Sequence, residues 1–260
     1  TLFRISEHVN RAGAKQILIG ESLQLQPVGA GGVFKKLSEN FTCAPVTEIN
    51  RQKEHWQREM VENFALGKSD VAMQSLYDNG KIVIAKTHNG RMNALVRDYL
   101  ADPKPVTEKF AIAMTNNDVE ALNFRIRGHL IKEGKLDPLK SCQVKCSDGF
   151  TRDFALGDRL VFTKAQKSDD AQRGKLLNSE TATVVAINRW LSGKPSALKI
   201  RTDDGKEHYL NVNSEHNIKH GYAITTHKSQ GGTKDNTYIL PSSTMNNLHT
   251  SYVALSRHRE

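Results

Sequence analysis

Four segments of the sequence combine residue types that could bind phosphate groups. In the first, residues 17–32, an apolar run ends at Gly20 and is followed by Gln24 and a glycine-rich stretch. The run is typical of a buried strand, and polar side chains that follow a strand of a parallel sheet lie at the edge where such sheets bind ligands. A helix expected over residues 31–37 has a glycine-rich start that suits close approach by an anion. An ordinary strand-to-helix loop is the alternative interpretation.

Two further segments each deliver an arginine. Residues 46–52 are expected to form a short strand that carries Arg51 into a polar loop. Residues 252–260 are expected to include a helix whose apolar side faces the sheet, with Arg257 near its end. Because arginines are mostly exposed in folded proteins, a solvated surface charge is the simpler interpretation of Arg51.

The last of the four segments, residues 225–233, places hydroxyls, an imidazole, a cation and a glycine pair at a strand-to-helix turn. Such a turn can hold backbone N–H groups and the ammonium of Lys228 against phosphates. No GxxxxGK[ST] loop occurs anywhere in the chain, so this is not a standard phosphate-binding loop.

The elements that must position these segments alternate between strands and helices in the first half of the chain. Residues 16–20, 81–85 and 110–114 are strand-like apolar runs, and this alternation indicates a parallel sheet with crossover helices. The clearest helix follows the third run. Asn117 is expected to cap it, Glu120 lies three residues later, and Gly134 ends its apolar periodicity.

From residue 144 to about residue 212 the pattern is that of β-structure. Hairpin-type turns at residues 147–149 and 203–205 separate strands expected at residues 159–163, 181–187, 198–202 and 207–212. The α/β pattern then returns with a strand at residues 222–224, a helix start at Thr226, a strand at residues 237–240 and a last helix from about Asn246. A small barrel inserted into an α/β domain accounts best for this order.

The composition narrows the class of partner. The 260 residues include 37 Lys and Arg against 28 Asp and Glu, a formal charge of +9, which indicates a polyanionic partner such as nucleic acid, or simply a basic surface. No apolar run approaches the roughly 18 residues that span a bilayer, and no leader pattern opens the sequence. With three cysteines, no zinc-site spacing and no membrane partner, we expect reduced thiols in a cytoplasmic protein.

Taken together, the four segments resemble the later motifs of superfamily 1 helicases in order and approximate spacing. ILIGESLQLQPVGAGG is similar to motif III, TEINRQ to motif IV, TTHKSQGGT to motif V and YVALSRHRE to motif VI. The nearest resemblance is to the RecD-like branch, and within it to the helicase portion of conjugative relaxases of the TraA/TraI/MobA type. Those proteins also carry sequences similar to FAIAMTNNDVEALN and FALGDRLVFTK of this chain.

The resemblance implies a nucleotide site. Gln24, after Gly20, takes the place of the motif III glutamine that contacts the terminal phosphate of ATP, although Glu21 stands where the family usually has Asp. Arg51 and Arg257 match the two arginines that reach the γ-phosphate from the second lobe, and both are expected at a cleft rather than in the packed core. A planar guanidinium with five fixed donors suits a phosphoryl group during transfer.

The resemblance also implies contacts to a DNA strand. Thr226 and His227 match motif V positions that touch the DNA backbone, and Lys228 lies beside them. Gln230 and Gly231, assigned to nucleotide binding, fall where the family couples that contact to the nucleotide. The turn at Thr115 and Asn116 resembles another single-strand contact.

The fold implied is the second lobe of a RecA-like P-loop NTPase, a parallel α/β sheet with an inserted SH3-like β-barrel. Residues 1–40 would be the end of the first RecA-like lobe, residues 41–143 and 218–260 the second lobe, and residues 144–217 the barrel. Neither Walker A nor the Asp-Glu pair of motif II precedes Gly20. We therefore expect a C-terminal fragment that begins after motif II.

The function implied is the C-terminal portion of an ATP-dependent DNA helicase, moving 5′ to 3′, in conjugative DNA transfer. ATP and Mg²⁺ would serve the parent protein, with the Mg²⁺ ligands outside this chain. Its partners would be single-stranded DNA and the missing N-terminal RecA-like lobe, and the chain alone is expected to be inactive. The alternative is a non-enzymatic module for single-strand DNA binding or recruitment, derived from a helicase.

Overall fold

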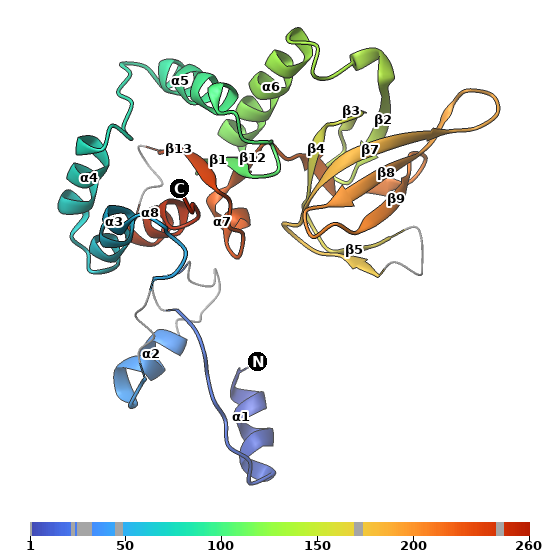
Figure 1. The fold of residues 1–260 in the computed structure, drawn as a ribbon. Coiled ribbons are helices and arrows are strands. Elements are labelled where there is room, and N and C mark those ends of the chain that lie inside the picture. Colours follow the sequence, from blue (N-terminus) through green and yellow to red (C-terminus); the bar gives the residue numbers. More distant parts are fainter. Residues whose placement is uncertain (1, 22–23, 25–32, 45–48, 169–173, 243–246) are drawn as a thin grey trace. The chain divides into compact units, whose positions relative to one another are not determined.

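The computed structural model describes residues 2–21, 24, 33–44, 49–168, 174–242 and 247–260. The chain divides into two compact units, Thr1–Glu48 and Ile49–Glu260. The first unit contains the helices α1 (Leu2–Arg11) and α2 (Val33–Asn40) (Figure 1). The helix predicted over residues 31–37 therefore has a counterpart in α2, whereas the glycine-rich stretch before it lies outside the described residues.

The strand predicted at residues 16–20 is wrong. This segment is extended but pairs with no described strand, and Ile17 and Ile19 are 77% and 95% exposed. A strand is stable only when its N–H and C=O groups pair with a neighbour, so an apolar run alone does not produce one.

The second unit is built on a three-stranded parallel sheet in the order β12-β1-β13. Its strands are β12 (Ala223–Thr225), β1 (Lys109–Ala113) and β13 (Asn236–Leu240). Ala113, at the carboxyl end of the central strand, lies opposite Thr225 on one side and Leu240 on the other. The carboxyl ends of all three strands therefore form one edge of the sheet.

Helices cover both faces of this sheet. The helices of the second unit are α3 (His55–Ala65), α4 (Ser69–Asp78), α5 (His88–Ala101), α6 (Asn116–Lys132), α7 (Thr226–Ser229) and α8 (Leu248–Leu255). Of these, α3 and α4 pack with each other and with α8. Side chains of α5 and α6 pack with Ala111 and Ala113 in one core cluster, while Phe110 and Ile112 pack with Ala254 of α8 on the other face. The alternation along β1 thus divides its side chains between two cores.

The strand 110–114 and the long helix after it are confirmed, with one change at the helix start. The residue that caps α6 is Thr115, whose hydroxyl accepts a hydrogen bond from the N–H of Asp118, and not Asn117. The helix ends before Gly134, whose φ of 70° fits a glycine. The strand predicted at residues 81–85 is wrong, because this segment pairs with no described strand and leaves Ile84 81% exposed.

Between α6 and β12 lies an all-β insertion, which we call the β-module (residues 141–220). Its strands are β2 (Ser141–Cys146), β3 (Thr151–Ala155), β4 (Arg159–Phe162), β5 (Gln166–Lys167), β6 (Lys175–Leu176), β7 (Thr181–Arg189), β8 (Pro195–Thr202), β9 (Glu207–Asn211), β10 (Glu215–His216) and β11 (Ile218–His220), preceded by a short helix, Pro138–Lys140. The main sheets have the orders β11-β4-β7-β8-β9 and β10-β2-β3. They enclose one apolar cluster that includes Phe154, Phe162 and Leu198. The predicted strands of this region all have counterparts.

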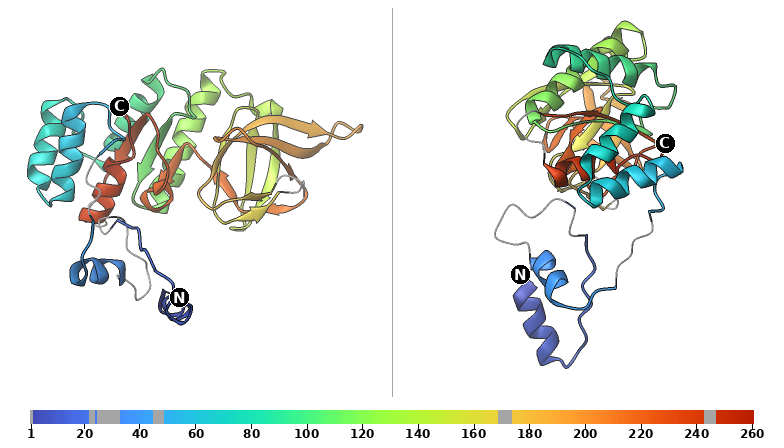
Figure 2. Two further views of the ribbon diagram at one scale, coloured as in Figure 1. Left: turned by 60° about the horizontal axis from the view of Figure 1, so that its bottom comes forward. Right: turned by 90° about the vertical axis from the view of Figure 1, so that its left-hand side faces the viewer.

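Charged and close-packed contacts hold the β-module against the α/β sheet. Asp203, in the turn between β8 and β9, accepts hydrogen bonds from Arg159 within the module and from Lys234, which follows the glycine pair of the lobe. At Gly221, between β11 and β12, a Cβ would lie 2.6 Å from the backbone of Leu160, so only glycine fits. The left view of Figure 2 shows the module beside the helix-covered sheet.

Candidate nucleotide and nucleic-acid interface

Two arginines that are 206 positions apart in the sequence converge on one segment of the chain. Arg51 Nη1 donates a 2.6 Å hydrogen bond to the carbonyl oxygen of Ser256. Arg257 Nε donates to the carbonyl oxygen of Val253 at 2.9 Å, and its Nη2 donates to the Ser256 hydroxyl at 2.8 Å. Neither guanidinium forms an ion pair with a carboxylate of the described residues. The segment thus gathers two positive charges that lack a counter-ion within the described part of the chain.

Burial makes this charge costly. Arg257 is only 3% exposed, whereas Arg51 is half-buried. Burial, and then repulsion from Arg51, lowers the pKa of Arg257 to about 10. The Arg257 side chain is therefore packed against the end of α8, and Arg51 is the more accessible of the two arginines. An anion bound beside the Arg51 and Arg257 guanidinium groups would stabilise the charged form of Arg257.

Gln52 and His258 support the same segment, and sequence reasoning did not single them out. Gln52 is 1% exposed, and its side-chain amide donates to the carbonyl oxygens of His258 at 2.8 Å and Ser256 at 3.4 Å. Burial lowers the pKa of His258 to about 4, which keeps the ring neutral at pH 7. In the sequence, Gln52 is marked only by its position after Arg51. Amide side chains are common, so this position alone carries little information.

The candidate DNA residues meet at the carboxyl edge of the parallel sheet. Thr115 and Asn116 follow β1 and begin α6, and the segment 225–228 follows β12 and forms α7. Since β1 and β12 are adjacent, with Ala113 opposite Thr225, the two turns lie side by side. Thr225 caps its short helix by accepting from the N–H of Lys228. Two segments far apart in the sequence thus form one edge.

The side chains on this edge divide into exposed and buried ones. Asn116 and His227 are exposed. Thr226 is 2% exposed, and its hydroxyl contacts the sulfur of Met114 at 3.0 Å. The Thr226 side chain therefore fixes the turn against β1, and the contact of Thr226 with the DNA backbone stays a prediction.

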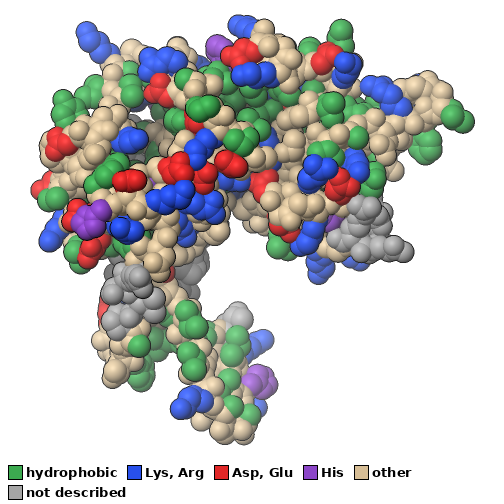
Figure 3. Space-filling view, in the orientation of Figure 1, with side chains coloured by type: hydrophobic (Ala, Val, Ile, Leu, Met, Phe, Trp, Pro, Cys, Tyr) green, Lys and Arg blue, Asp and Glu red, His purple; other side chains and the backbone are tan. Residues whose placement is uncertain are grey.

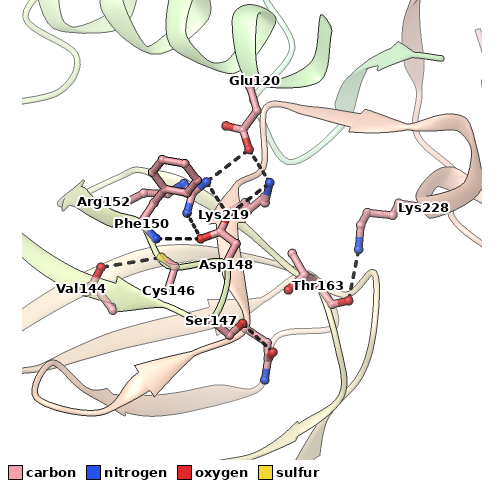
Figure 4. Close-up of polar contacts among 11 residues, drawn as sticks. Glu120, Val144, Cys146, Ser147, Asp148, Phe150, Arg152, Thr163, Lys219 and Lys228 are labelled. Atoms are coloured by element: carbon pink, nitrogen blue, oxygen red, sulfur yellow. Dashed lines mark hydrogen bonds and ion pairs between the residues drawn. The ribbon is translucent and has the colours of Figure 1, made fainter. Parts of the chain in front are cut away.

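Lys228 reaches from the edge toward the β-module (Figure 4). Its Nζ lies 3.3 Å from Asn178 Oδ1 and 3.5 Å from the carbonyl oxygens of Phe162 and Thr163. Burial, and then the charge of Lys219, lowers its pKa. No carboxylate of the described residues pairs with it. The ammonium is thus held by neutral acceptors and remains available to a phosphate.

A network of ion pairs lies behind Lys228 and joins α6 to the β-module. Glu120 of α6 pairs with Lys219 and, at 3.3 Å, with Arg152, and Asp148 pairs with Arg152 at 2.7 Å. A small pocket between these elements is lined by Asn116, Glu120, Lys219 and Lys228, among others. The sheet edge and the module therefore meet at a polar, largely basic surface.

The other predicted nucleotide residues belong to other segments of the chain than the two arginines. Gln230 and Gly231 are exposed after α7, and Gly231 has a φ of 85° that favours glycine. Gly20 and Gln24 belong to the first unit, where a Cβ at Gly20 would lie 3.0 Å from the Phe34 ring. Residues 22–23, 25–32 and 45–48, which complete the predicted motifs III and IV, are outside the described residues.

Neither a group of metal ligands nor a membrane-spanning helix is found among the described residues. No group of three or more His, Cys, Asp or Glu side chains gathers in a metal-binding arrangement within them. None of the helices they form is long and apolar enough to cross a bilayer.

Comparison with known proteins identifies the relatives of this chain. A family model described as an AAA domain matches residues 1–87. The chain is 31% identical over 257 residues to the probable conjugal transfer protein TraA of Sinorhizobium fredii and 31% identical over 250 residues to the conjugal transfer protein TraA of Rhizobium radiobacter. These alignments cover 98% and 96% of this chain, which spans 22% of the length of each relative.

Solved structures share the fold. A crystal structure of Bacteroides Pif1 bound to single-stranded DNA matches with a TM-score of 0.53 and 20% identity, over 95% of this chain and 61% of that chain. A structure of the same helicase with ADP-AlF3 and single-stranded DNA matches with a TM-score of 0.51 over 95% of this chain and 61% of that chain. The fold is that of a RecA-like helicase. Within that class its relatives are the TraA conjugal transfer proteins, as the motif resemblance implied.

Proposed function

We propose that this chain supplies the second RecA-like lobe and motif III of an ATP-dependent DNA helicase that acts in conjugative DNA transfer, moving 5′ to 3′. The observation that carries the proposal is the convergence of Arg51 and Arg257 on Ser256 without a carboxylate of the described residues beside them. The TraA relatives support the conjugative role, and the Pif1 structures support the fold.

In this proposal the domains follow the predicted bounds. Residues 1–40 close the first RecA-like lobe, residues 41–143 and 218–260 form the second, and residues 144–217 form an SH3-like barrel. Two β-sheets that share a single apolar cluster support a small-barrel assignment. The partners are single-stranded DNA and a first lobe that carries the phosphate-binding loop, and the location is cytoplasmic.

The mechanism proposed is closure of the two lobes around ATP and Mg²⁺. Arg51 and Arg257 would contact the γ-phosphate, where planar guanidinium groups offset the charge that develops during transfer. Gln24 would contact the same phosphate. The Mg²⁺ ligands would come from the first lobe. Opening and closing of the two lobes would alternately tighten and weaken the binding of the DNA backbone at the sheet edge.

The test uses a protein in which this chain is joined to a first lobe with a GxxxxGK[ST] loop and acidic Mg²⁺ ligands. We expect ATP hydrolysis that single-stranded DNA stimulates. Arg257→Ala should lower turnover by roughly 10³-fold, the scale of an arginine finger. Because Arg257 is buried, Arg257→Gln and a thermal melt of each variant separate loss of chemistry from loss of folding. Unchanged turnover in a folded Arg257 variant would contradict the proposal.

The 260-residue chain alone has a separate expectation, because its sequence contains no GxxxxGK[ST] loop. It should bind single-stranded DNA in a salt-dependent way and hydrolyse ATP no faster than background. The same behaviour is expected if the chain has the alternative function, that of a non-enzymatic module for single-strand DNA binding or recruitment. The joined protein distinguishes them, since only a helicase lobe restores DNA-stimulated hydrolysis there.

A further inference from the structure

The β7–β8 hairpin projects from the β-module as a two-stranded ribbon (Figures 1 and 2). Only Thr181, Ala182 and Thr183 of β7 pair with β4, and the pairing of β8 with β9 ends at Ala197. Beyond these positions β7 and β8 pair only with each other within the described residues. The tip, residues 189–194, is thus held away from the sheet.

This tip displays two large apolar side chains to solvent. Trp190 is 61% exposed and Leu191 is fully exposed. Neither belongs to a core cluster of the described residues. An exposed Trp-Leu pair at the end of a ribbon contributes nothing to folding, so its presence points to a ligand.

The tip is rigid rather than loose. Trp190 N–H donates to the carbonyl oxygen of Lys194 at 2.9 Å, and Gly193 N–H donates to the carbonyl oxygen of Trp190 at 2.8 Å. Gly193 has a φ of 79°, which glycine adopts without strain. The guanidinium of Arg189 donates to the Gly193 carbonyl at 3.0 Å. The backbone that carries the indole is therefore ordered before a ligand binds, which reduces the entropy lost on binding.

The charge around the tip identifies the kind of ligand. No acidic residue occurs between Glu180 and Asp203, while this stretch contains four basic residues. Two of them, Lys199 and Arg201, pair with Glu207 at the base of the ribbon. The remaining two, Arg189 and Lys194, flank the apolar tip, and Figure 3 shows Lys or Arg side chains beside hydrophobic ones at the end of the hairpin. An aromatic side chain between cations is the combination that binds unpaired nucleobases and their phosphates.

We propose that the tip of the β7–β8 hairpin is a second single-strand DNA contact, in which the Trp190 indole stacks on an unpaired base and Arg189 and Lys194 contact phosphates. This inference rests on the proposed function, because it assumes that the chain binds single-stranded DNA. It adds a contact on the β-module that is separate from the sheet edge at Thr115, Asn116 and residues 225–228.

The experiment exploits the presence of only two tryptophans, Trp56 and Trp190. In the Trp56→Phe chain, tryptophan emission comes from Trp190 alone, and oligo(dT) should quench it saturably. Fluorescein-labelled oligo(dT) anisotropy, measured on the same chain, should give the same midpoint. Trp190→Ala should weaken binding by roughly tenfold, the scale of one base stack. Trp190→Phe should retain most of the affinity, and Ser192→Ala, at the same tip, should match the wild type.

The outcomes separate this inference from the proposed function. If anisotropy reports saturable binding while Trp190 emission stays constant, or if Trp190→Ala binds as the wild type does, the hairpin inference is wrong and the sheet edge carries binding. If no oligonucleotide binds at low salt, both proposals fail. An emission shift that depends on protein concentration without DNA would assign the tip to a second copy of the chain and overturn the DNA contact. Because Trp190 and Ser192 are exposed, their variants should fold normally.

Discussion

The hydrogen bond from the Arg51 guanidinium to the Ser256 carbonyl joins the two ends of the second unit at one point. Gln52 strengthens the same junction by donating to Ser256 and His258. Since Arg257 comes directly after Ser256, any shift of Arg51 is transmitted to the position of the second guanidinium. The two arginines should therefore act as a pair rather than as independent charges.

Arg51→Ala in the joined protein should lower ATP turnover by roughly 10³-fold and leave DNA affinity without nucleotide nearly unchanged. Arg51→Lys should rescue little, because a single ammonium cannot reproduce the planar fork. Steady-state hydrolysis with saturating oligo(dT), beside anisotropy without nucleotide, measures both. If Arg51→Ala loses DNA binding and keeps turnover, the assigned roles of the arginines are wrong.

His227→Ala and Lys228→Ala should produce the reverse pattern. Both residues lie at the carboxyl edge of the sheet beside Asn116, and the Lys228 ammonium has only neutral acceptors among the described residues. DNA affinity and DNA-stimulated turnover should fall, while basal turnover survives. For Lys228→Ala the dependence of binding on salt should also become shallower by about one phosphate contact. Lys175→Ala, an exposed basic residue of β6, is the matched control for loss of one positive charge.

The sequence predicted those elements whose pattern is local. The 3.6-residue periodicity after Met114 was sufficient for α6, and the turns with Gly149 and Gly205 were sufficient for the hairpins of the β-module. The strands at residues 16–20 and 81–85 failed, because an apolar run shows that burial would be favourable and not which neighbour provides it. The cap of α6 shifted to Thr115 because a hydroxyl after the strand competes equally well with Asn117.

The residues of the candidate site were proposed from the sequence, whereas their spatial arrangement came only from the structure. Motif resemblance selected Arg51 and Arg257, yet nothing in the sequence indicates that Arg257 is buried or that both meet at Ser256. Thr226 resembles a DNA contact, but a hydroxyl can equally bond inward, and here it contacts Met114. Long-range pairings such as Asp203 with Lys234 have no local signature at all.

The neutral, buried His258 should make stability depend on pH. Its pKa is lowered to about 4 by burial, whereas an unfolded histidine titrates near 6.5. Between these values the unfolded chain binds more protons, so stability is complete above about pH 6.5 and is lost as the pH falls toward 4. At pH 5 the loss should be about 2 kcal/mol. Urea denaturation at pH 7.5 and pH 5 measures this loss of stability.

His220, whose pKa is also lowered by burial, adds to the same trend. The diagnostic result is therefore a smaller pH effect in His258→Asn than in the wild type, and equal effects would contradict the assignment.

The stability of the second unit should be sensitive to loss of the ion pairs at Asp203. Burial alone would raise the pKa of Asp203, but the hydrogen bonds and charges of Arg159 and Lys234 outweigh it and lower the pKa. The side chains of Arg159 and Lys234 are 0% and 10% exposed, so Asp203→Asn leaves two buried cations without their carboxylate.

Removing one partner of a buried pair usually costs 3–5 kcal/mol, and because Asp203 itself is 26% exposed we expect about 2–3 kcal/mol. The neighbouring Asp204, whose side chain is 48% exposed and pairs with Lys206, gives a matched control: Asp204→Asn should cost about 0.5 kcal/mol or less. Urea denaturation of the two variants compares them directly. Equal costs would mean that Asp203 does not hold the β-module against the α/β sheet, which would leave that role to the other contacts, such as the ion pairs of Glu120 and the close packing at Gly221.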